Sequence, residues 1–121
     1  MQYQRLYADG DGETHFAEIP LTLDEVDYRP PAPMVYVSHA MQAGALQFIR
    51  LPSGWSGENI CPPQRQFLIC LKGHLQVQAS DGKKRTFSSG DAILMEDTAG
   101  RGHNSHVKGG TDLIAAVISL E

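Results

Sequence analysis

The sequence predicts an all-β domain, an antiparallel sandwich or barrel built from many short strands. Short stretches of alternating or continuous apolar residues recur along the chain, as they do in half-buried or buried strands. Turn-forming glycine, aspartate and proline residues separate these stretches. No segment longer than about two turns has the 3.6-residue period of an amphipathic helix. This pattern by itself does not choose between the different antiparallel barrels.

The first third of the chain is expected to contain two strands and an irregular connection. Gln2 to Ala8 forms the first strand and is closed by the turn sequence Asp-Gly-Asp-Gly, and His15 to Ile19 alternates and forms the second. Leu21 to Asp27 is predicted to form one helical turn, with Thr22 as its N-cap. Three prolines between Arg29 and Pro33 make that segment an extended connection.

The rest of the chain contains the other predicted strands. They are expected at Met34–His39, Ala45–Leu51, Gln66–Leu71, His74–Ser80, Lys84–Phe87, Ala92–Glu96 and Asp112–Leu120. Pro52 to Pro63 is predicted to be a loop, because it holds Gly54, Gly57 and two adjacent prolines. Asp81-Gly82 is a strong signal for a tight hairpin.

Length and composition restrict the class of protein. A chain of 121 residues suffices for one domain with one core. With 41% hydrophobic and 20% charged residues it is expected to be a soluble globular protein. A formal net charge of -4 and a pI near 5.7 speak against a general nucleic-acid binder. No apolar run approaches the roughly 20 residues of a membrane span, so we expect no membrane partner.

The two cysteines and the N-terminus indicate a cytoplasmic protein. Cys61 and Cys70 do not make a disulfide framework, and we interpret both as reduced thiols. Cys70 lies in an apolar strand and is expected to be buried and inert, whereas Cys61 lies in the predicted loop and is the more reactive candidate. The first residues have no apolar signal region, so secretion by that route is not expected.

The segment from Gly90 to Val107 contains the most specific pattern in the sequence. A short buried strand is followed by a loop with two glycines, which delivers His103 to the start of the next strand. We interpret Asp97 as accepting hydrogen bonds from amides of this loop. His106 is three residues from His103, so the two side chains are expected on opposite faces of a strand. His74 is likewise expected to face outward.

These residues resemble a known family. Gly90, Gly100 and His103 resemble the second motif of the cupin superfamily, and the phrase EDTAGRGH, ending at His103, resembles the EDTTGKGH signature of a group of small single-domain cupins. The resemblance implies a double-stranded β-helix, or jelly-roll barrel, in one domain over residues 1–121. Residues 1–44 would supply N-terminal strands and a proline-rich connection, and residues 45–121 the barrel.

The first cupin motif departs from the family pattern. Laid onto the frame from Gly54 to Gly73, its two histidine positions fall at Ile60 and Pro62, and its glutamate position falls at Gln66. In the small cupin group this segment resembles His-x-x-Pro-Arg-Arg-Gln-Phe, and the chain keeps Pro63, Arg65, Gln66 and Phe67 of it. The resemblance therefore implies a metal site that has lost most of its ligands.

Two possibilities for a cofactor follow. Either no metal is bound, or a divalent ion such as iron, manganese, nickel or zinc is held by His103 and Gln66, with Cys61 as a substitute ligand. A neutral amide is a weak ligand for such ions, and three donors of this kind make a poor site. The competing interpretation is that His103 only forms a hydrogen bond across the barrel mouth.

Several side chains near the predicted barrel mouth are candidates for the function. His103 is the candidate catalytic residue, and Trp55, Cys61, Arg65, Gln66 and Phe67 are candidates for binding a ligand. A solvated arginine, and aromatic rings that only fill the core, are the alternatives for Arg65, Trp55 and Phe67.

Four functions compete on this pattern. The first is a cupin that binds a small organic molecule without redox chemistry. The second is a metal-dependent enzyme, a dioxygenase or isomerase, acting on a small polar metabolite through His103. The third is a metal-free isomerase or lyase with His103 as acid or base, and the fourth is an assembly module. Cupins commonly pair through N-terminal strands, and open sheet edges need covering, so we expect a homodimer.

Overall fold

The computed structural model describes residues 1–120, and its regular secondary structure consists entirely of strands over that range. The strands are β1 (Gln2–Ala8), β2 (Thr14–Pro20), β3 (Asp24–Val26), β4 (Val35–Val37), β5 (Ala43–Leu51), β6 (Ser56–Ile60), β7 (Gln66–Lys72), β8 (His74–Ala79), β9 (Lys84–Phe87), β10 (Ala92–Met95), β11 (His103–Lys108) and β12 (Leu113–Leu120). In this part of the chain no helix has the length and hydropathy needed to cross a bilayer.

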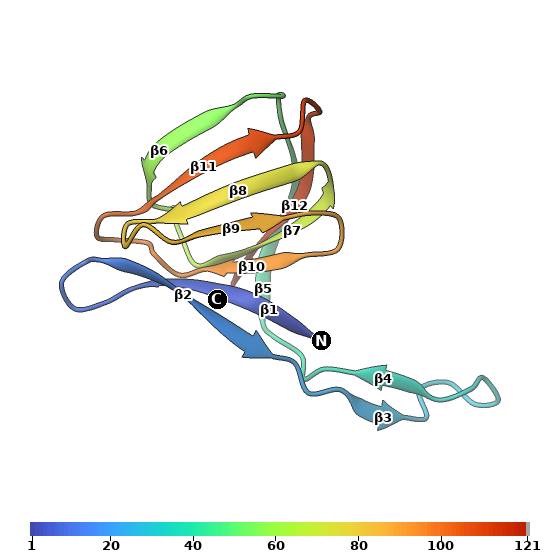
Figure 1. The fold of residues 1–121 in the computed structure, drawn as a ribbon. Coiled ribbons are helices and arrows are strands. Elements are labelled where there is room, and N and C mark those ends of the chain that lie inside the picture. Colours follow the sequence, from blue (N-terminus) through green and yellow to red (C-terminus); the bar gives the residue numbers. More distant parts are fainter. Residues whose placement is uncertain (121) are drawn as a thin grey trace.

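Two sheets form the body of the molecule (Figure 1). The larger has the strand order β2-β1-β10-β7-β12-β5, and the smaller has the order β6-β11-β8-β9. All neighbours are antiparallel except β1 and β10, which run parallel with Gln4 opposite Ile93. The all-β jelly-roll barrel expected from the sequence is confirmed. β1 and β2 complete the larger sheet, so the N-terminal segment contributes directly to the barrel.

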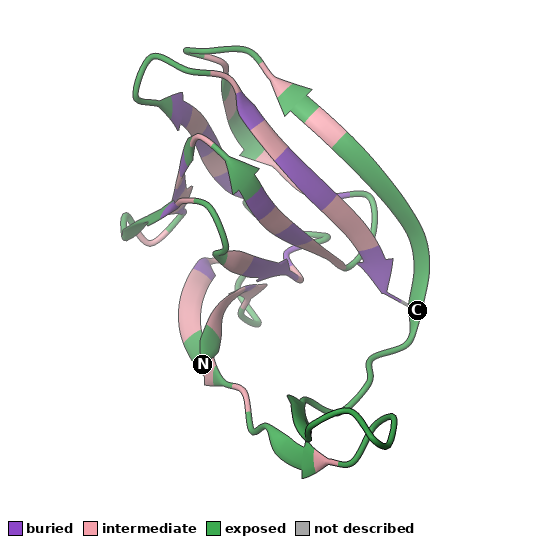
Figure 2. Ribbon diagram, turned by 90° about the vertical axis from the view of Figure 1, so that its right-hand side faces the viewer, coloured by how far each residue is buried: buried purple, intermediate pink, exposed green. Residues whose placement is uncertain are grey.

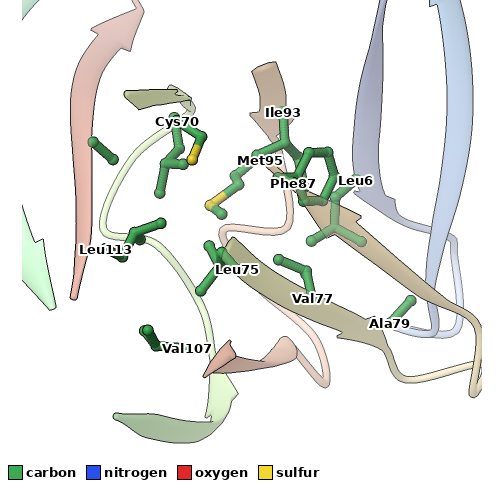
Figure 3. Packing of buried hydrophobic residues seen from close by; sticks show 12 residues of the cluster. Leu6, Cys70, Leu75, Val77, Ala79, Phe87, Ile93, Met95, Val107 and Leu113 are labelled. Atoms are coloured by element: carbon green, nitrogen blue, oxygen red, sulfur yellow. The ribbon is translucent and has the colours of Figure 1, made fainter. Parts of the chain in front are cut away.

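The core lies between the two sheets and follows from the alternation of side chains along each strand. Leu75, Val77 and Ala79 of β8 point inward, as the alternating sequence predicts. They meet buried residues of the larger sheet (Figure 3). The cluster consists of Leu6, Leu68, Cys70, Leu75, Val77, Ala79, Phe87, Ile93, Met95, Val107, Leu113 and Ala115. Cys70 is buried as expected, and burial raises the pKa of its thiol.

Two local predictions are wrong. Residues 21–27 form no helical turn; part of this segment is β3, which pairs with β4, with Asp24 opposite Val37. A single helical turn is costly to nucleate, whereas the extended chain pairs its backbone groups with β4. The segment from Pro52 to Pro63 is not all loop, because β6 pairs there with β11. Its Gly57 and Asn59 have poor strand propensity, so the pairing partner, rather than local sequence, decides the conformation.

The β3–β4 hairpin projects away from the barrel (Figure 1) and is exposed almost throughout (Figure 2). It nevertheless carries large apolar side chains. Tyr28 is 72% exposed and Tyr36 is 63% exposed, and Met34, Val35 and Val37 are exposed beside them. An extension with so much uncovered apolar surface is unusual for an isolated chain.

The outer face of the larger sheet is also apolar. One row of cross-strand neighbours consists of Leu46, Ile118 and Phe67, from β5, β12 and β7. The adjacent row consists of Phe48, Ala116 and Ile69 from the same three strands. Antiparallel sheets with one face in water normally show polar residues there. This face therefore has the composition of a buried surface.

Candidate functional site

A cavity of about 230 Å³ opens between the two sheets at the end of the barrel where β6 and β11 meet. Most of its lining is apolar. The lining residues are Ile49, Leu51, Trp55, Ile60, Cys61, Pro62, Pro63, Gln66, Leu68, Leu75, Met95, His103 and Ser105. The cavity thus combines an apolar wall with a few polar groups, as small-molecule sites usually do.

His103 is the most buried titratable group in this lining. It is the first residue of β11, and only 3% of its side chain is exposed. Its Nδ1 lies 2.6 Å from Oδ2 of Asp97 and forms a hydrogen bond with it. Among residues 1–120, Nε2 has no hydrogen-bond partner. Because Nδ1 is engaged, Nε2 is the polar atom that the ring can offer to a ligand.

Asp97 follows β10 and its side chain is fully buried. The interpretation of Asp97 as a loop-capping residue is wrong, because its carboxylate accepts the hydrogen bond of His103 instead. Its second oxygen, Oδ1, has no partner within the described residues. A buried carboxylate with one partner holds that partner firmly, since separating the two leaves an unpaired charge. Asp97 therefore fixes the orientation of the imidazole.

Hydrogen bonds with the β1–β2 turn and with the first residue of β2 hold the loop between Asp97 and His103. The backbone N of Arg101 donates to the carbonyl of Gly12 over 2.9 Å. The buried hydroxyl of Thr14 donates to the carbonyl of Gly102, also over 2.9 Å. Gly102 has a φ of +70°, and a Cβ there would lie 2.5 Å from the carbonyl oxygen of Ile60. Glycine is therefore required where this loop passes β6.

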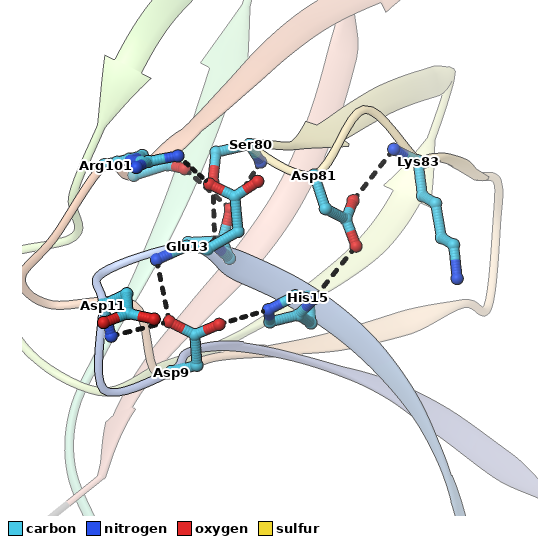
Figure 4. Close-up of polar contacts among 10 residues, drawn as sticks. Asp9, Asp11, Glu13, His15, Ser80, Asp81, Lys83 and Arg101 are labelled. Atoms are coloured by element: carbon cyan, nitrogen blue, oxygen red, sulfur yellow. Dashed lines mark hydrogen bonds and ion pairs between the residues drawn. The ribbon is translucent and has the colours of Figure 1, made fainter.

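A polar network next to this loop joins the β1–β2 turn to the β8–β9 turn (Figure 4). Nε2 of His15 lies 2.7 Å from Asp9, and Nδ1 lies 3.1 Å from Asp81. The hydrogen bond to Asp9 raises the pKa of His15, and Asp81 adds to this effect. The same bond lowers the pKa of Asp9. In the same network, Glu13 forms an ion pair with Arg101 of the loop.

The structure brings four of the six sequence-predicted site residues together. Trp55, Cys61, Gln66 and His103 all line the cavity. Cys61 lies close to the loop, with Sγ 3.6 Å from the carbonyl oxygen of Gly100.

The other two predicted site residues lie elsewhere. Arg65 is half-exposed and forms an ion pair with Glu96, with Nε 2.5 Å from Oε2. The Phe67 ring packs against Tyr3 on the outer face of the larger sheet, with ring centroids 5.0 Å apart. Phe67 follows Gln66 in β7, and successive side chains of a strand point to opposite faces. Neither residue lines the cavity.

His106 and His74 lie as the sequence predicts, and His39 is exposed as well. His106 lies on the opposite face of β11 from buried His103. His74 is exposed, and its Nδ1 contacts the hydroxyl of Ser88. His39 is 89% exposed beside Asp24 and does not line the cavity.

The donors around His103 do not fit a divalent transition metal. Within residues 1–120, no three histidine, cysteine, aspartate or glutamate side chains come together as ligands. Ile60 lies directly opposite His103 in the β6–β11 pairing, where its aliphatic side chain has no lone pair. The carboxylate of Asp97 is bonded to Nδ1 of His103. Cys61 and Gln66 remain, and they are too few and too weak as a set.

Asp97 is the functional candidate that sequence reasoning assigned to another role. Its position six residues before His103, across a glycine loop, does carry a signal. Whether the two ends of this loop meet depends on how the strand before it and the strand after it are placed in the barrel. β10 and β11 belong to different sheets, and this topology lies outside what local sequence shows.

Comparison with solved structures shows the cupin fold. A cupin 2 conserved barrel domain protein from Salinispora arenicola CNS-205 superposes with a TM-score of 0.52 at 14% identity, over 84% of this chain and 76% of that chain. The cupin domain of Schizosaccharomyces pombe Cnp3 gives a TM-score of 0.47 at 9% identity, over 99% of this chain and 84% of that chain. No family model matches the sequence, and no curated protein is significantly similar to it.

Proposed function

We propose that this protein binds a small, mainly apolar organic molecule in the cavity of its cupin barrel, with His103 as the polar anchor. One observation carries the proposal: a buried imidazole, fixed by Asp97 through Nδ1, lines a mostly apolar cavity, and its Nε2 has no hydrogen-bond partner within the described residues. An apolar wall supplies affinity, and a single oriented polar group supplies selectivity. Both cysteines are free, which agrees with binding a cytoplasmic metabolite.

The degenerate first motif supports binding without a metal. Ile60 and Pro62 stand where the cupin pattern has ligand histidines, and both line the cavity. Their side chains convert a polar metal pocket into an apolar wall. The chain accordingly resembles the small single-domain cupins of the EDTxGxGH group in its second motif, with a first motif adapted to a different ligand.

General acid–base catalysis without a metal is the second candidate function, and the Asp97–His103 pair favours it. A carboxylate that holds Nδ1 of a histidine leaves Nε2 to exchange a proton with a bound molecule. A small molecule with an exchangeable proton beside Nε2 would then be a substrate for proton transfer. Binding is required for either function and is tested first.

Two measurements test the cavity, one for a molecule that co-purifies with the protein and one with simple aromatic probes. Untagged protein is denatured after gentle purification, and the released small molecules are identified by mass spectrometry. In parallel, naphthalene, 2-methoxynaphthalene and 2-naphthol are titrated into ¹⁵N-labelled protein. Binding is expected to shift the indole resonance of Trp55, the only tryptophan in the chain, and the amide of Ser105.

A cavity-blocking variant serves as the control. Ile60 lines the cavity and is half-buried, so Ile60→Trp should fill the opening and remove the shifts while the melting temperature stays close to that of the unmodified protein. If no small molecule is released and none of the three probes shifts these resonances, the proposed function is wrong.

A further inference from the structure

We propose that the ligand of this cavity carries one acidic hydroxyl group, of the phenol or enol class, which forms a hydrogen bond with Nε2 of His103. This inference rests on the binding function proposed above and narrows it to a chemical class. It follows from the hydrogen-bonding capacity of the ring, from the charges around the cavity and from the cavity's size.

The ring restricts the polar group that it can bind. Nδ1 is occupied by Asp97, so a ligand meets only Nε2. In a neutral ring held this way Nε2 accepts a hydrogen bond, and in a protonated ring it donates one. A hydroxyl group satisfies both forms, since it can donate its proton or accept through its oxygen. A carbonyl group satisfies only the protonated ring, and an ether or hydrocarbon leaves the neutral ring without a donor.

The charges near the cavity exclude a strongly anionic ligand. No lysine or arginine is among the cavity-lining residues in the described chain. Arg65 is held by Glu96, and Arg101 is held by Glu13. A phosphate or a dicarboxylate would therefore lose its hydration without gaining a cationic partner. A neutral molecule with a single weakly acidic proton has no such cost.

The remaining polar groups of the lining are few. Gln66 and Ser105 are neutral, and Cys61 is a weak hydrogen-bond donor and acceptor. The rest of the lining is aliphatic, aromatic, proline or methionine side chains. One hydroxyl on an apolar body matches this distribution, whereas a polyhydroxylated molecule such as a sugar would leave most of its groups unpaired.

The volume sets the size of the apolar body. A cavity of roughly 150 Å³ holds a benzene molecule, and this one has about 230 Å³. One substituted ring, or two fused rings, therefore fit. Trp55, which also lines the cavity, provides an aromatic neighbour for such a ring.

Asp97 acts as a positioning residue in this scheme. It accepts the hydrogen bond of Nδ1 and does not line the cavity. A carboxylate partner on Nδ1 fixes the tautomer and the orientation of the ring, so the lone pair of Nε2 is held in a set direction. The hydrogen bond from a ligand hydroxyl to Nε2 should then strengthen as the hydroxyl becomes more acidic, and Asp97 should set how steeply it does so.

The test uses phenols paired with their methyl ethers. The affinities of 4-methylphenol, 4-cyanophenol and 4-nitrophenol, and of the three corresponding anisoles, are measured by calorimetry at a pH where the phenols are neutral in solution. Each phenol should bind roughly tenfold more tightly than its ether, because the ether has no proton to donate to Nε2 of the neutral ring. This ratio should grow from the methyl to the nitro compound, and the ether series corrects for the size and polarity of each substituent.

Variants test whether the preference for phenols over ethers depends on the Asp97–His103 pair. Removing His103 alone would leave Asp97 buried without a partner, so the double variant Asp97→Leu/His103→Phe is used. It should still bind the anisoles and lose the preference for phenols. Asp97→Asn should retain binding but flatten the dependence on acidity. His106→Gln, on the opposite face of the same strand, is the matched control and should behave like the unmodified protein.

The outcomes separate this inference from the binding function. If the phenols and the anisoles bind equally well to the unmodified protein, the inference is wrong while the cavity remains a binding site. If neither series binds, the proposed function itself fails. Should the double variant not fold, the ratio of phenol affinity to ether affinity in the unmodified protein still tests the inference. If this ratio falls as the phenol becomes more acidic, the role given to Asp97 and His103 is wrong.

Discussion

Gly12 and Gly100 pack backbone against backbone, and this contact joins the N-terminal turn to the loop that carries the candidate site. Gly100 has a φ of +92°, and a Cβ there would lie 2.7 Å from the carbonyl oxygen of Gly12. The loop between Asp97 and His103 is thus supported by a segment almost ninety residues away in the sequence. The orientation of His103 depends on strands β1 and β2 as well as on its own strand.

Gly100→Ala should destabilise the protein more than a glycine-to-alanine change at an open turn. Gly82 provides the matched control, because its φ of +93° is nearly the same and no atom lies within 4 Å of its hypothetical Cβ. Gly82→Ala should cost only the conformational term of about 1–2 kcal/mol. Gly100→Ala should add the clash with Gly12. Chemical denaturation measures both, and equal losses of stability would show that the contact is unimportant.

The contacts of the His15 ring with the carboxylates of Asp9 and Asp81 should make the stability of the protein depend on pH. The pKa of His15 is raised above its ordinary value of 6.5, so its contribution is fully present below pH 6.5 and is lost as the pH rises through the folded-state pKa. The pKa of Asp9 is lowered from 3.8, so the contribution of Asp9 is present above pH 3.8 and is lost as the pH falls through the folded-state pKa.

The difference in melting temperature between the unmodified protein and His15→Gln should therefore shrink above neutral pH. His74→Gln is a suitable control, because His74 contacts a hydroxyl group and no carboxylate in its hydrogen bond. If the difference in melting temperature between the unmodified protein and His15→Gln stays constant from pH 6 to about pH 9, the contacts of His15 with the two carboxylates do not stabilise the protein.

Glu96 should stabilise the protein at neutral pH and lose this effect in acid, whereas the effect of His15 is lost at higher pH. Burial opposes ionisation of Glu96, but hydrogen bonds from Arg5 and Arg65 outweigh it and lower the pKa of this carboxyl below 4.5. Its contribution is present above pH 4.5 and disappears as the pH falls through the folded-state pKa. Glu96→Gln should therefore melt earlier at neutral pH and converge with the unmodified protein in acid. A gap in melting temperature that widens on acidification would refute this assignment.

We expect two copies of the chain to form a two-fold symmetric dimer through the apolar hairpin and the apolar sheet face. The hairpin with Tyr36 and the face with Leu46 and Phe48 are both exposed and belong to one chain, so each copy can cover the other. A stable interface buries about 800 Å² per partner. The two apolar surfaces span both hairpin strands and the outer side of β5, β12 and β7, and we expect them to supply this area together.

Light scattering at micromolar concentration should therefore give twice the chain mass. Phe48→Glu should shift the protein to monomers, and its melting temperature should lose the dependence on protein concentration. Glu58→Gln on β6, away from this face, is the control. A monomer of the unmodified chain contradicts the expectation of a homodimer.

Restoring the lost ligands should restore metal binding. Ile60 pairs with His103 across β6 and β11, so Ile60→His places a second imidazole beside the first, and Gln66→Glu adds a carboxylate in the same cavity lining. Elemental analysis of the untagged double variant should show more zinc or iron than the unmodified protein. No increase would mean that the first cupin motif has been aligned incorrectly. Stoichiometric metal in the unmodified protein that is lost in the double variant Asp97→Leu/His103→Phe would instead favour the metal-dependent enzyme.

Local sequence was sufficient for the features that depend on alternation and turn chemistry. The side chains of β8 alternate in the sequence as they do in the core, and the Asp81-Gly82 hairpin joins β8 to β9 where it was expected. The placement of His103 at the start of a strand, with His106 on the opposite face, also followed from spacing alone. These features need only the geometry of a few neighbouring residues.

The tertiary structure decided which distant groups meet. Ser56 to Ile60 form a strand only because β11 offers its backbone, and the short β3 forms only beside β4. Asp97 reaches His103 because of how the two sheets pack on each other. The same packing decides that the face of β7 carrying Gln66, and not the opposite face carrying Phe67, turns toward the cavity. Pairings of this kind are set by contacts between segments far apart in the chain, and local propensity carries no information about them.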